Sequence, residues 1–286
     1  MDITFTELLW LFLIYSFLGW GFEAVVGTIK NRRFTNRGFS TGPFCIVYGI
    51  AAVTMQITLA DLMDDPVFLL LGCGIQATFI EWFTGKLLEL INRRKWWDYS
   101  NKKWNFDGYI CFEYTLLWAV LGSVSVKYGN TFFLFLYKLI PEPFPAVLTW
   151  VISGYVALDS AVSLAAVFHL RRSKKKAGNL SSKLYKAALA IIRYVERRMA
   201  KAYPVIEERS EEILKEGKFA EGCGFYKLFW LFLIGALLRA ITETIFCRLT
   251  AGVWMSRSSL VWGPFSIVWG LAIALATSLL YKDKDK

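Results

Sequence analysis

Long apolar segments separated by short charged loops make up most of the chain. Seven segments have the length of about 20 residues that a helix needs to cross the hydrocarbon core of a bilayer. They are Leu8–Ile29, Gly42–Leu62, Val67–Ile91, Tyr109–Val126, Phe144–Leu170, Phe225–Phe246 and Val261–Leu280. The apolar piece Thr131–Ile140 is too short and ends at Pro141, so we interpret it as an interfacial or re-entrant element. The pattern predicts an all-α polytopic membrane protein with about seven transmembrane helices.

The charges of the loops predict how these helices are oriented. Lys and Arg are concentrated after the first, third and fifth predicted spans, whereas the loop after the second span carries Asp61, Asp64 and Asp65. Basic loops stay on the cytoplasmic side of a membrane. We therefore expect an external N-terminus, cytoplasmic basic loops and a cytoplasmic tail. The N-terminus lacks the basic region and cleavage site of a signal peptide, so the first span is expected to remain in the mature protein.

Composition supports this class and argues against others. Of the 286 residues, 56% are hydrophobic, and the formal net charge is +10. The basic residues lie at the ends of apolar runs and form no contiguous basic face, so we expect no nucleic-acid partner. The five cysteines show no metal-binding spacing and there is one histidine, so we expect no metal and no cofactor. A lipid bilayer is the expected surrounding of the chain.

The chain divides into a membrane domain (1–170), a polar insert (171–223) and a C-terminal membrane hairpin with a charged tail (224–286). Within the insert, apolar residues recur at helical spacing over 183–199 with Lys and Arg between them. One interpretation is a basic amphipathic helix that lies on anionic headgroups. The other is a docking site for a cytoplasmic partner such as an ATPase.

The first and last hairpins resemble each other. Leu8–Ile14 matches Leu228–Ile234, and Gly42-Pro-Phe-Cys-Ile-Val-Tyr-Gly49 matches Gly263-Pro-Phe-Ser-Ile-Val-Trp-Gly270. This predicts a duplication of the hairpin over 8–62, with a fainter copy over 67–126. Three predicted spans separate the first hairpin from the last, so the two are expected to be inverted. Inverted repeats are typical of secondary transporters, which bind substrate between the copies.

Charged residues inside predicted spans are candidates for function, because burying a charge in a bilayer costs at least about 2.5–3.5 kcal/mol. They are Glu23, Glu81, Asp159, Arg239 and Glu243. The last two are four residues apart and can pair on one helix face. This pair is either a helix-packing ion pair or part of a substrate pathway, and both alternatives remain open.

Further candidates lie in the loops. Arg37 and Arg257 occupy corresponding positions beside the Gly-Pro helix starts, where the positive end of a helix favours an anion. Asn36 adjoins Arg37 in the same recognition loop. Asp98 and Asn105 lie in an aromatic-rich loop that we expect to be ordered and to fold back toward the substrate site.

Three motifs carry a family resemblance: Asn36-Arg37-Gly38-Phe39 followed by Gly42–Gly49, then Trp96-Trp97-Asp98-Tyr99-Ser100, then Asn105-x-x-Gly108. They resemble the ABC-transporter type IV permease-like (CmpB-like) family over about residues 8 to 128. The resemblance implies a bacterial multispanning permease. It implies no particular substrate, ATPase partner or catalytic residue.

Three functions are compatible with these features. The preferred one is a transporter of a small polar or anionic solute, with the three glutamates as coupling acids and the two loop arginines as anion contacts. The second is a membrane-embedded enzyme that acts on a lipid or headgroup through Asp98, Asp107 or the glutamates. The third is a non-catalytic scaffold or sensor that acts through the 183–199 helix.

Overall fold

The computed structural model describes residues 3–32, 34, 42–92, 95, 97–172, 194, 197, 224–251 and 266–281. These residues are helical apart from loops and one isolated β-bridge, so the all-α prediction is confirmed for the described part of the chain. The chain folds as two compact units. Unit 1 comprises Met1–Val53, Thr84–Trp96 and Thr131–Glu216, and unit 2 comprises Thr54–Phe83, Trp97–Asn130 and Gly217–Lys286.

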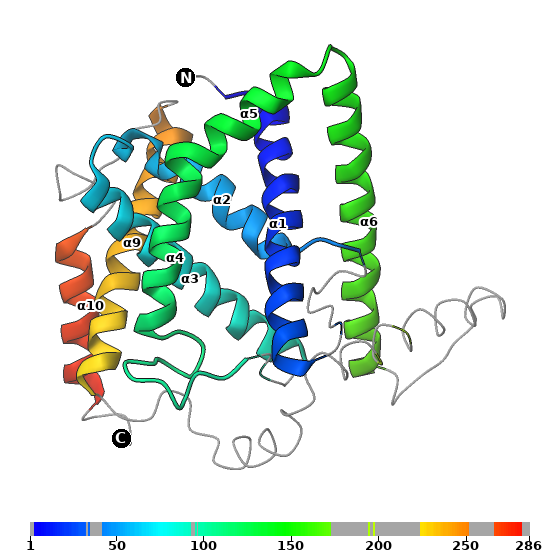
Figure 1. Cartoon of the computed structure of the whole chain (residues 1–286). Coiled ribbons are helices and arrows are strands. Elements are labelled where there is room, and N and C mark those ends of the chain that lie inside the picture. The colour runs from blue at the N-terminus through cyan, green and yellow to red at the C-terminus, as the bar shows by residue number, and fades with distance from the viewer. Residues whose placement is uncertain are drawn as a thin grey trace. The chain divides into compact units, whose positions relative to one another are not determined.

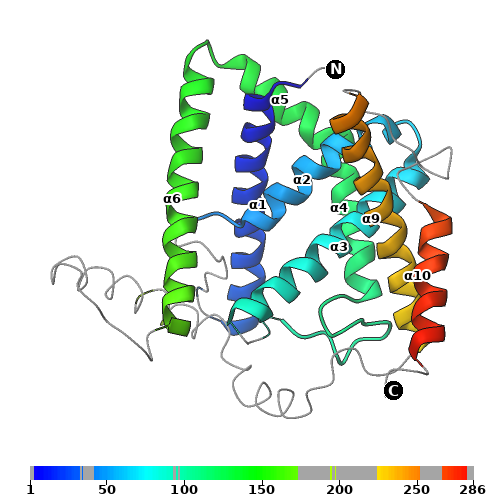
Figure 2. The same cartoon turned by 180° about the vertical axis from the view of Figure 1, so that it is seen from behind.

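The helices of unit 1 include α1 (Phe5–Asn31) and α6 (Phe144–Arg172), which lie side by side (Figures 1 and 2). Helix α1 begins with a capping box, in which the Thr4 hydroxyl accepts from the Glu7 amide and the Glu7 carboxylate accepts from the Thr4 amide. Lys138 of α5 (Asn130–Leu139) lies 3.4 Å from the same carboxylate. These contacts stabilise the start of α1.

Helix α2 (Ile46–Leu59) starts in unit 1 and is followed by a 3-10 turn, Ala60–Leu62. At 1.5 Å per residue its 14 residues extend about 21 Å, which is shorter than a hydrocarbon core of about 30 Å. The last helix, α10 (Ile267–Leu280), has the same length. The structure therefore does not confirm full spans over Gly42–Leu62 and Val261–Leu280.

In unit 2, α3 (Pro66–Asn92) packs against α4 (Phe112–Val124) through small and hydroxyl-bearing residues. A Cβ at Gly74 would lie 3.0 Å from Ala119, and the hydroxyls of Thr78 and Thr115 are 2.8 Å apart. Small residues let membrane helices approach closely, and hydroxyl pairs add interhelical hydrogen bonds. This contact closes the α3–α4 hairpin.

The predicted separate element at Thr131–Ile140 is corrected by the structure. Helix α4 continues through a π-helical turn, Ser125–Gly129, into α5. The result is one apolar helix over Phe112–Leu139, with 28 residues. A π-helical turn inserts one residue without breaking the helix, so Thr131–Ile140 continues the helix of the fourth predicted span.

Among the residues that the structure describes, four helices are long and apolar enough to cross a membrane: Phe5–Ile29, Pro66–Leu90, Phe112–Leu139 and Phe144–Leu164. Their apolar side chains are widely exposed, as α6 shows with Trp150 54% and Leu158 67% exposed. A large exposed apolar surface is suited to lipid, not to water. The protein is therefore an all-helical membrane protein.

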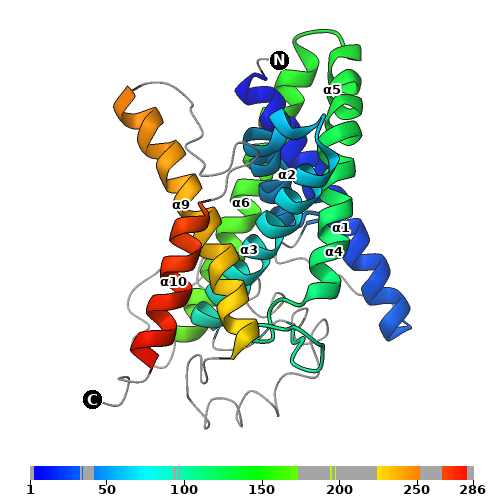
Figure 3. The same ribbon diagram turned by 90° about the vertical axis from the view of Figure 1, so that its left-hand side faces the viewer.

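Helix α9 (Phe225–Ala251) packs on α10 as the second hairpin of unit 2, and α10 lies along the first half of α9 (Figure 3). The end of α10 returns to the start of α9, where the Lys227 ammonium lies 5.8 Å from the Tyr281 ring centre. Trp230 of α9 packs with Phe106 and Ile110 of the α3–α4 loop. Helix α9 therefore starts at the loop end of the α3–α4 hairpin, and the two hairpins of unit 2 run in opposite directions.

Candidate functional site

In two hairpins the second helix begins beside the middle of the first helix. The amide of Cys45, just before α2, donates to the Ser16 carbonyl of α1 at 2.8 Å. The amide of Ser266, just before α10, donates to the Ala236 carbonyl of α9 at 3.1 Å. The sequence repeat aligns Cys45 with Ser266 and Ser16 with Ala236. The two hairpins thus share a backbone contact at aligned positions.

A close glycine contact is shared in the same way. A Cβ at Gly49 of α2 would lie 2.5 Å from the Phe12 carbonyl oxygen, and one at Gly270 of α10 would lie 2.6 Å from that of Phe232. The repeat aligns these residues pair by pair. Because glycine lacks a Cβ, the short helix can rest directly on the backbone of the long one.

Glu23 lies on α1 beyond the point where α2 begins, and α2 supplies its hydrogen-bond donor. The Tyr48 hydroxyl donates to Glu23 Oε1 at 2.9 Å. The Tyr48 ring rests on Gly19, where a Cβ would lie 2.2 Å from the ring carbon Cγ. Glycine at position 19 therefore makes room for the ring that reaches the acid.

Glu243 occupies the aligned position on α9 and receives its donor from a different residue. An Arg239 guanidinium nitrogen lies 3.1 Å from Glu243 Oε1. The same guanidinium lies 5.2 Å from the ring centre of Trp269 on α10, within the range of a cation–π contact. Arg239 aligns with Gly19, and Trp269 aligns with Tyr48. The predicted pairing of Arg239 with Glu243 is confirmed.

Glu81 lies on α3 and accepts hydrogen bonds on both carboxylate oxygens. The Tyr99 hydroxyl is 3.3 Å from Oε1, and the indole nitrogen of Trp118 is 3.2 Å from Oε2. The Tyr99 ring stacks on Tyr114 with centroids 4.6 Å apart. When Gly108 is aligned with Gly42, Tyr114 takes the position of Tyr48. An acid on the first helix and an aromatic residue at the start of the second thus occur in all three hairpins.

Asp159 holds the chain segment that leads into α2. Its side chain on α6 is 9% exposed, and Oδ2 accepts from the Gly42 amide at 2.9 Å. Tyr155 lies one turn earlier on the same helix, and its ring is 6.5 Å from that of Phe44. Asp159 therefore positions the start of α2.

Asp98 and Asn105 shape the loop between α3 and α4. Asp98 Oδ1 accepts from the amide and the hydroxyl of Ser100. The Asn105 side-chain amide donates to the carbonyls of Ser100 and Lys102 at 3.2 and 2.8 Å. The prediction of an ordered loop is confirmed. Nearby, Lys102 Nζ lies 2.7 Å from Glu113 Oε2, and this hydrogen bond raises the pKa of Lys102.

Asn36, Arg37 and Arg257 lie outside the described residues, as does most of the predicted 183–199 helix. Their predicted roles stay predictions. Within the described part of the chain, no group of three His, Cys, Asp or Glu side chains is placed to hold a metal ion.

Four residues of this arrangement were not predicted: Gly19, Tyr48, Tyr99 and Trp118. Tyr48 belongs to the repeated Gly-Pro-Phe-x-Ile-Val-aromatic-Gly motif, so the shared aromatic position was a usable signal. Tyr99 belongs to the Trp96–Ser100 motif of the family resemblance, but an aromatic loop is also an ordinary feature of membrane proteins. Trp118 had no such signal.

A model of the protein family described as "Putative ABC-transporter type IV" matches residues 10–164, which is more than half of the chain. The matched region contains Glu23, Glu81 and Asp159 together with their described donors. No curated protein and no solved structure matches the chain.

Proposed function

Because the chain belongs to the Putative ABC-transporter type IV family, we propose that it is a permease for a small polar or anionic solute in a bacterial cytoplasmic membrane. The expected arrangement is multi-pass, with cytoplasmic basic loops. The solute binds where the short helices begin, near the glutamates and the loop arginines.

One observation carries this proposal: α2 and α10 begin beside the middle of the long helices α1 and α9. A helix that starts at this depth directs the positive end of its dipole, and its first amide groups, into the membrane interior. Transporters use such short helices to bind anionic groups of their substrates near mid-membrane. The arrangement supports an anionic or strongly polar solute.

The proposed roles follow from the positions of the side chains. Glu23, Glu81 and Glu243 act as coupling acids, each on a long helix and each held by a donor described above. Arg37 and Arg257, with Asn36, contact the anion at the two aligned helix starts. Arg239 supports Glu243, and Asp159 holds the approach to α2. Asp98 and Asn105 maintain the loop beside Glu81.

The duplicated hairpin is the second element of the proposal. The matching contacts of the α1–α2 and α9–α10 hairpins support a duplication. In the described part of the chain, three helices that are long and apolar enough to cross a membrane separate these two hairpins, which supports an inverted pair. The 183–199 segment is proposed to rest on anionic headgroups or to bind an ATPase.

Solute exchange in proteoliposomes tests the proposal without an energy source. The full chain is reconstituted and assayed by counterflow with labelled phosphate, sulfate and glycine as probes. We expect exchange of at least one probe, reduced about tenfold or more in Glu23→Gln and Glu81→Gln, because a hydrogen bond to a charged group contributes about 1.5–3 kcal/mol. Glu113→Gln is the matched control, since Glu113 is 62% exposed on the loop side of α4.

Two results would contradict the proposal. One is the absence of exchange for every probe when the protein is folded and inserted. The other is an equal loss of exchange in Glu113→Gln and in the two intramembrane variants, because such a loss would not depend on the repeated acid position.

A further inference from the structure

The α3–α4 hairpin differs from the α1–α2 hairpin in what lies between the acid and the aromatic residue of the second helix. In α1–α2, Tyr48 of the second helix reaches Glu23 itself. In α3–α4, the ring of Tyr99 lies on Tyr114 and provides the hydroxyl that bonds Glu81. Tyr99 comes from the connecting loop and not from a helix. A loop side chain has thus entered the acid site of this hairpin.

The segment Trp97–Cys111, which we name the Tyr99 loop, is an ordered structure around that side chain. The Tyr99 amide donates to the Gly108 carbonyl at 2.7 Å. The Trp97 indole donates to the Tyr109 carbonyl at 2.8 Å. The last residue, Cys111, has no exposed surface. These bonds tie the position of Tyr99 to the shape of the whole loop.

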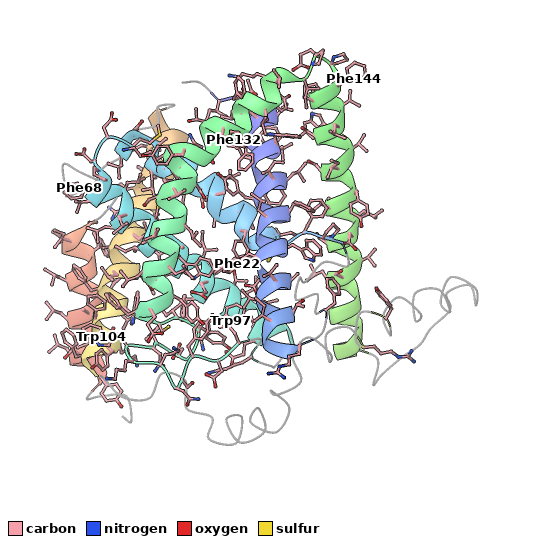
Figure 4. The ribbon with its side chains drawn as sticks, viewed as in Figure 1. Phe22, Phe68, Trp97, Trp104, Phe132 and Phe144 are labelled. Carbon is pink, nitrogen blue, oxygen red and sulfur yellow. The ribbon has the colours of Figure 1, made fainter. Side chains whose placement is uncertain are left out.

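The Tyr99 loop is fastened to the start of α9 through Trp104 (Figure 4). The Trp104 ring lies 4.9 Å from the ring of Tyr226 and 5.9 Å from that of Phe229, and its carbonyl accepts from the Trp230 indole at 3.3 Å. Trp104 has φ 55°, a left-handed conformation that is unfavourable for residues with a Cβ. Such conformations persist where surrounding contacts enforce them, and here the contacts come from α9.

We propose that Glu81, Trp118 and Tyr114 form a binding site for a hydroxyl or ammonium group of the solute, and that Tyr99 occupies it as an internal substitute. A solute group enters when the Tyr99 loop separates from the start of α9. This inference rests on the proposed transport function and names the solute chemistry at this hairpin. One carboxylate oxygen of Glu81 accepts a hydrogen bond from the solute group, and the Trp118 indole donates to the other oxygen. The ring of Tyr114 provides a flat apolar surface beneath the group.

Cys111 is a native reporter of the closed loop. Its side chain is buried, and burial raises the pKa of its thiol, so it reacts slowly with maleimides while the loop is closed. The other four cysteines (Cys45, Cys73, Cys223 and Cys247) are replaced by alanine in the full chain. N-ethylmaleimide labelling of Cys111 is then followed by mass spectrometry in detergent.

The loop contacts predict which substitutions accelerate labelling. We expect Tyr99→Ala, Trp104→Ala and Phe229→Ala each to increase the rate about tenfold or more, because each frees the loop from α3, α4 or α9. The Trp104→Ala/Phe229→Ala pair should show less than the product of the single effects, since both remove the same contact. Trp150→Ala, at a half-exposed tryptophan of α6, is the matched control and should leave the rate unchanged.

Chemical rescue tests the binding site itself. In Tyr99→Ala, 4-methylphenol has the ring and hydroxyl of the lost side chain and should slow Cys111 labelling again. Toluene, which lacks the hydroxyl, should not. Fast labelling of Cys111 in the parent protein, or an unchanged labelling rate in Tyr99→Ala, would contradict the proposal that the Tyr99 loop is closed. If 4-methylphenol fails to slow Cys111 labelling in Tyr99→Ala, or if toluene slows it equally, the proposed binding site for a hydrogen-bond donor is wrong.

This experiment and the exchange assay fail separately. Cys111 labelling needs no transport, so a shielded loop with no solute exchange would reject the transport function alone. Solute exchange in a protein whose Cys111 is labelled fast would leave the permease function intact. It would reject the proposal that the Tyr99 side chain occupies the solute site.

Discussion

The hydroxyl of Tyr48 lies 2.9 Å from the carboxylate of Glu23 and joins the first turn of α2 to the second half of α1. The two residues are 25 positions apart in the chain, and they meet because α2 starts beside the middle of α1. The bond places a polar pair between two largely apolar helices. A membrane interior provides little water to replace it, so both residues depend on the packing around them.

The first prediction concerns the glycine under the Tyr48 ring. Gly19→Ala should destabilise the protein by about 1–3 kcal/mol, because the added Cβ would overlap the ring and force it away from Glu23. Thermal unfolding in detergent measures the effect. Gly21→Ala is the control on the same helix, since a Cβ there meets nothing within 4 Å. Equal unfolding temperatures for the two variants would contradict the described ring position.

A second prediction concerns the carboxylate that holds the segment before α2. Asp159→Leu leaves the Gly42 amide without its acceptor and should lower the free energy of unfolding by about 1–3 kcal/mol. Asp159→Asn keeps an oxygen acceptor and should cost less. Ser160→Ala serves as control, because the Ser160 hydroxyl bonds only to its own helix at Val156 in the described contacts. An equal loss in Asp159→Asn and Asp159→Leu would show that the charge of Asp159, and not its acceptor oxygen for the Gly42 amide, is what matters.

The Arg239–Glu243 pair can be tested with a double-mutant cycle. Its side chains are 34% and 23% exposed, so solvent screening limits the expected coupling free energy to about 0.5–1 kcal/mol. We expect Glu243→Gln alone to destabilise more than the Arg239→Gln/Glu243→Gln pair, because the single change leaves a guanidinium without its carboxylate. Chemical unfolding of the four proteins provides the cycle. Additive effects would show that the two residues do not support each other.

The Cys111 thiol should respond to pH in a defined direction. Burial, together with the negative charges of Glu81 and Glu113, raises its pKa, so the thiolate fraction at neutral pH is below that of a free thiol. Labelling by a maleimide should therefore continue to increase with pH beyond the pH at which a free cysteine levels off. A free cysteine levels off near its pKa of about 8.5. A plateau for Cys111 at pH 8 would contradict the buried environment.

Sequence analysis identified the membrane class and the acids, and it was less successful with the extent of the helices. Apolar runs predicted α1, α3 and α6 within a few residues. Hydropathy also extended the second and last spans into segments where the structure has shorter helices, and it separated Thr131–Ile140 from the helix it completes. The hydropathy of a segment indicates whether it prefers lipid to water. It does not indicate the residue at which a helix begins.

The candidate site was predicted only in part, because the sequence indicates the acids more clearly than their hydrogen-bond donors. A glutamate within an apolar run is visible in the sequence, because burying a charge is costly anywhere in a membrane. Its donor is harder to identify. Tyr48 stands at a repeated aromatic position, but nothing in the sequence pairs Trp118 or Tyr99 with the acid. Asp98 and Asn105 were selected as site residues, and the structure gives both a role in loop geometry.

The sequence by itself determined that this protein is helical and embedded in lipid and which helices carry an acid, and it predicted that one hairpin recurs. These properties are local, because they depend on hydropathy and on letters that repeat at fixed spacing. Only the tertiary structure decided that Tyr48 donates to Glu23 and that a loop tyrosine donates to Glu81. The Tyr48–Glu23 bond follows from where α2 starts along α1, a position set by close backbone approach at Gly49. The Tyr99–Glu81 bond follows from the fold of the loop between α3 and α4, and both bonds join residues distant in the chain.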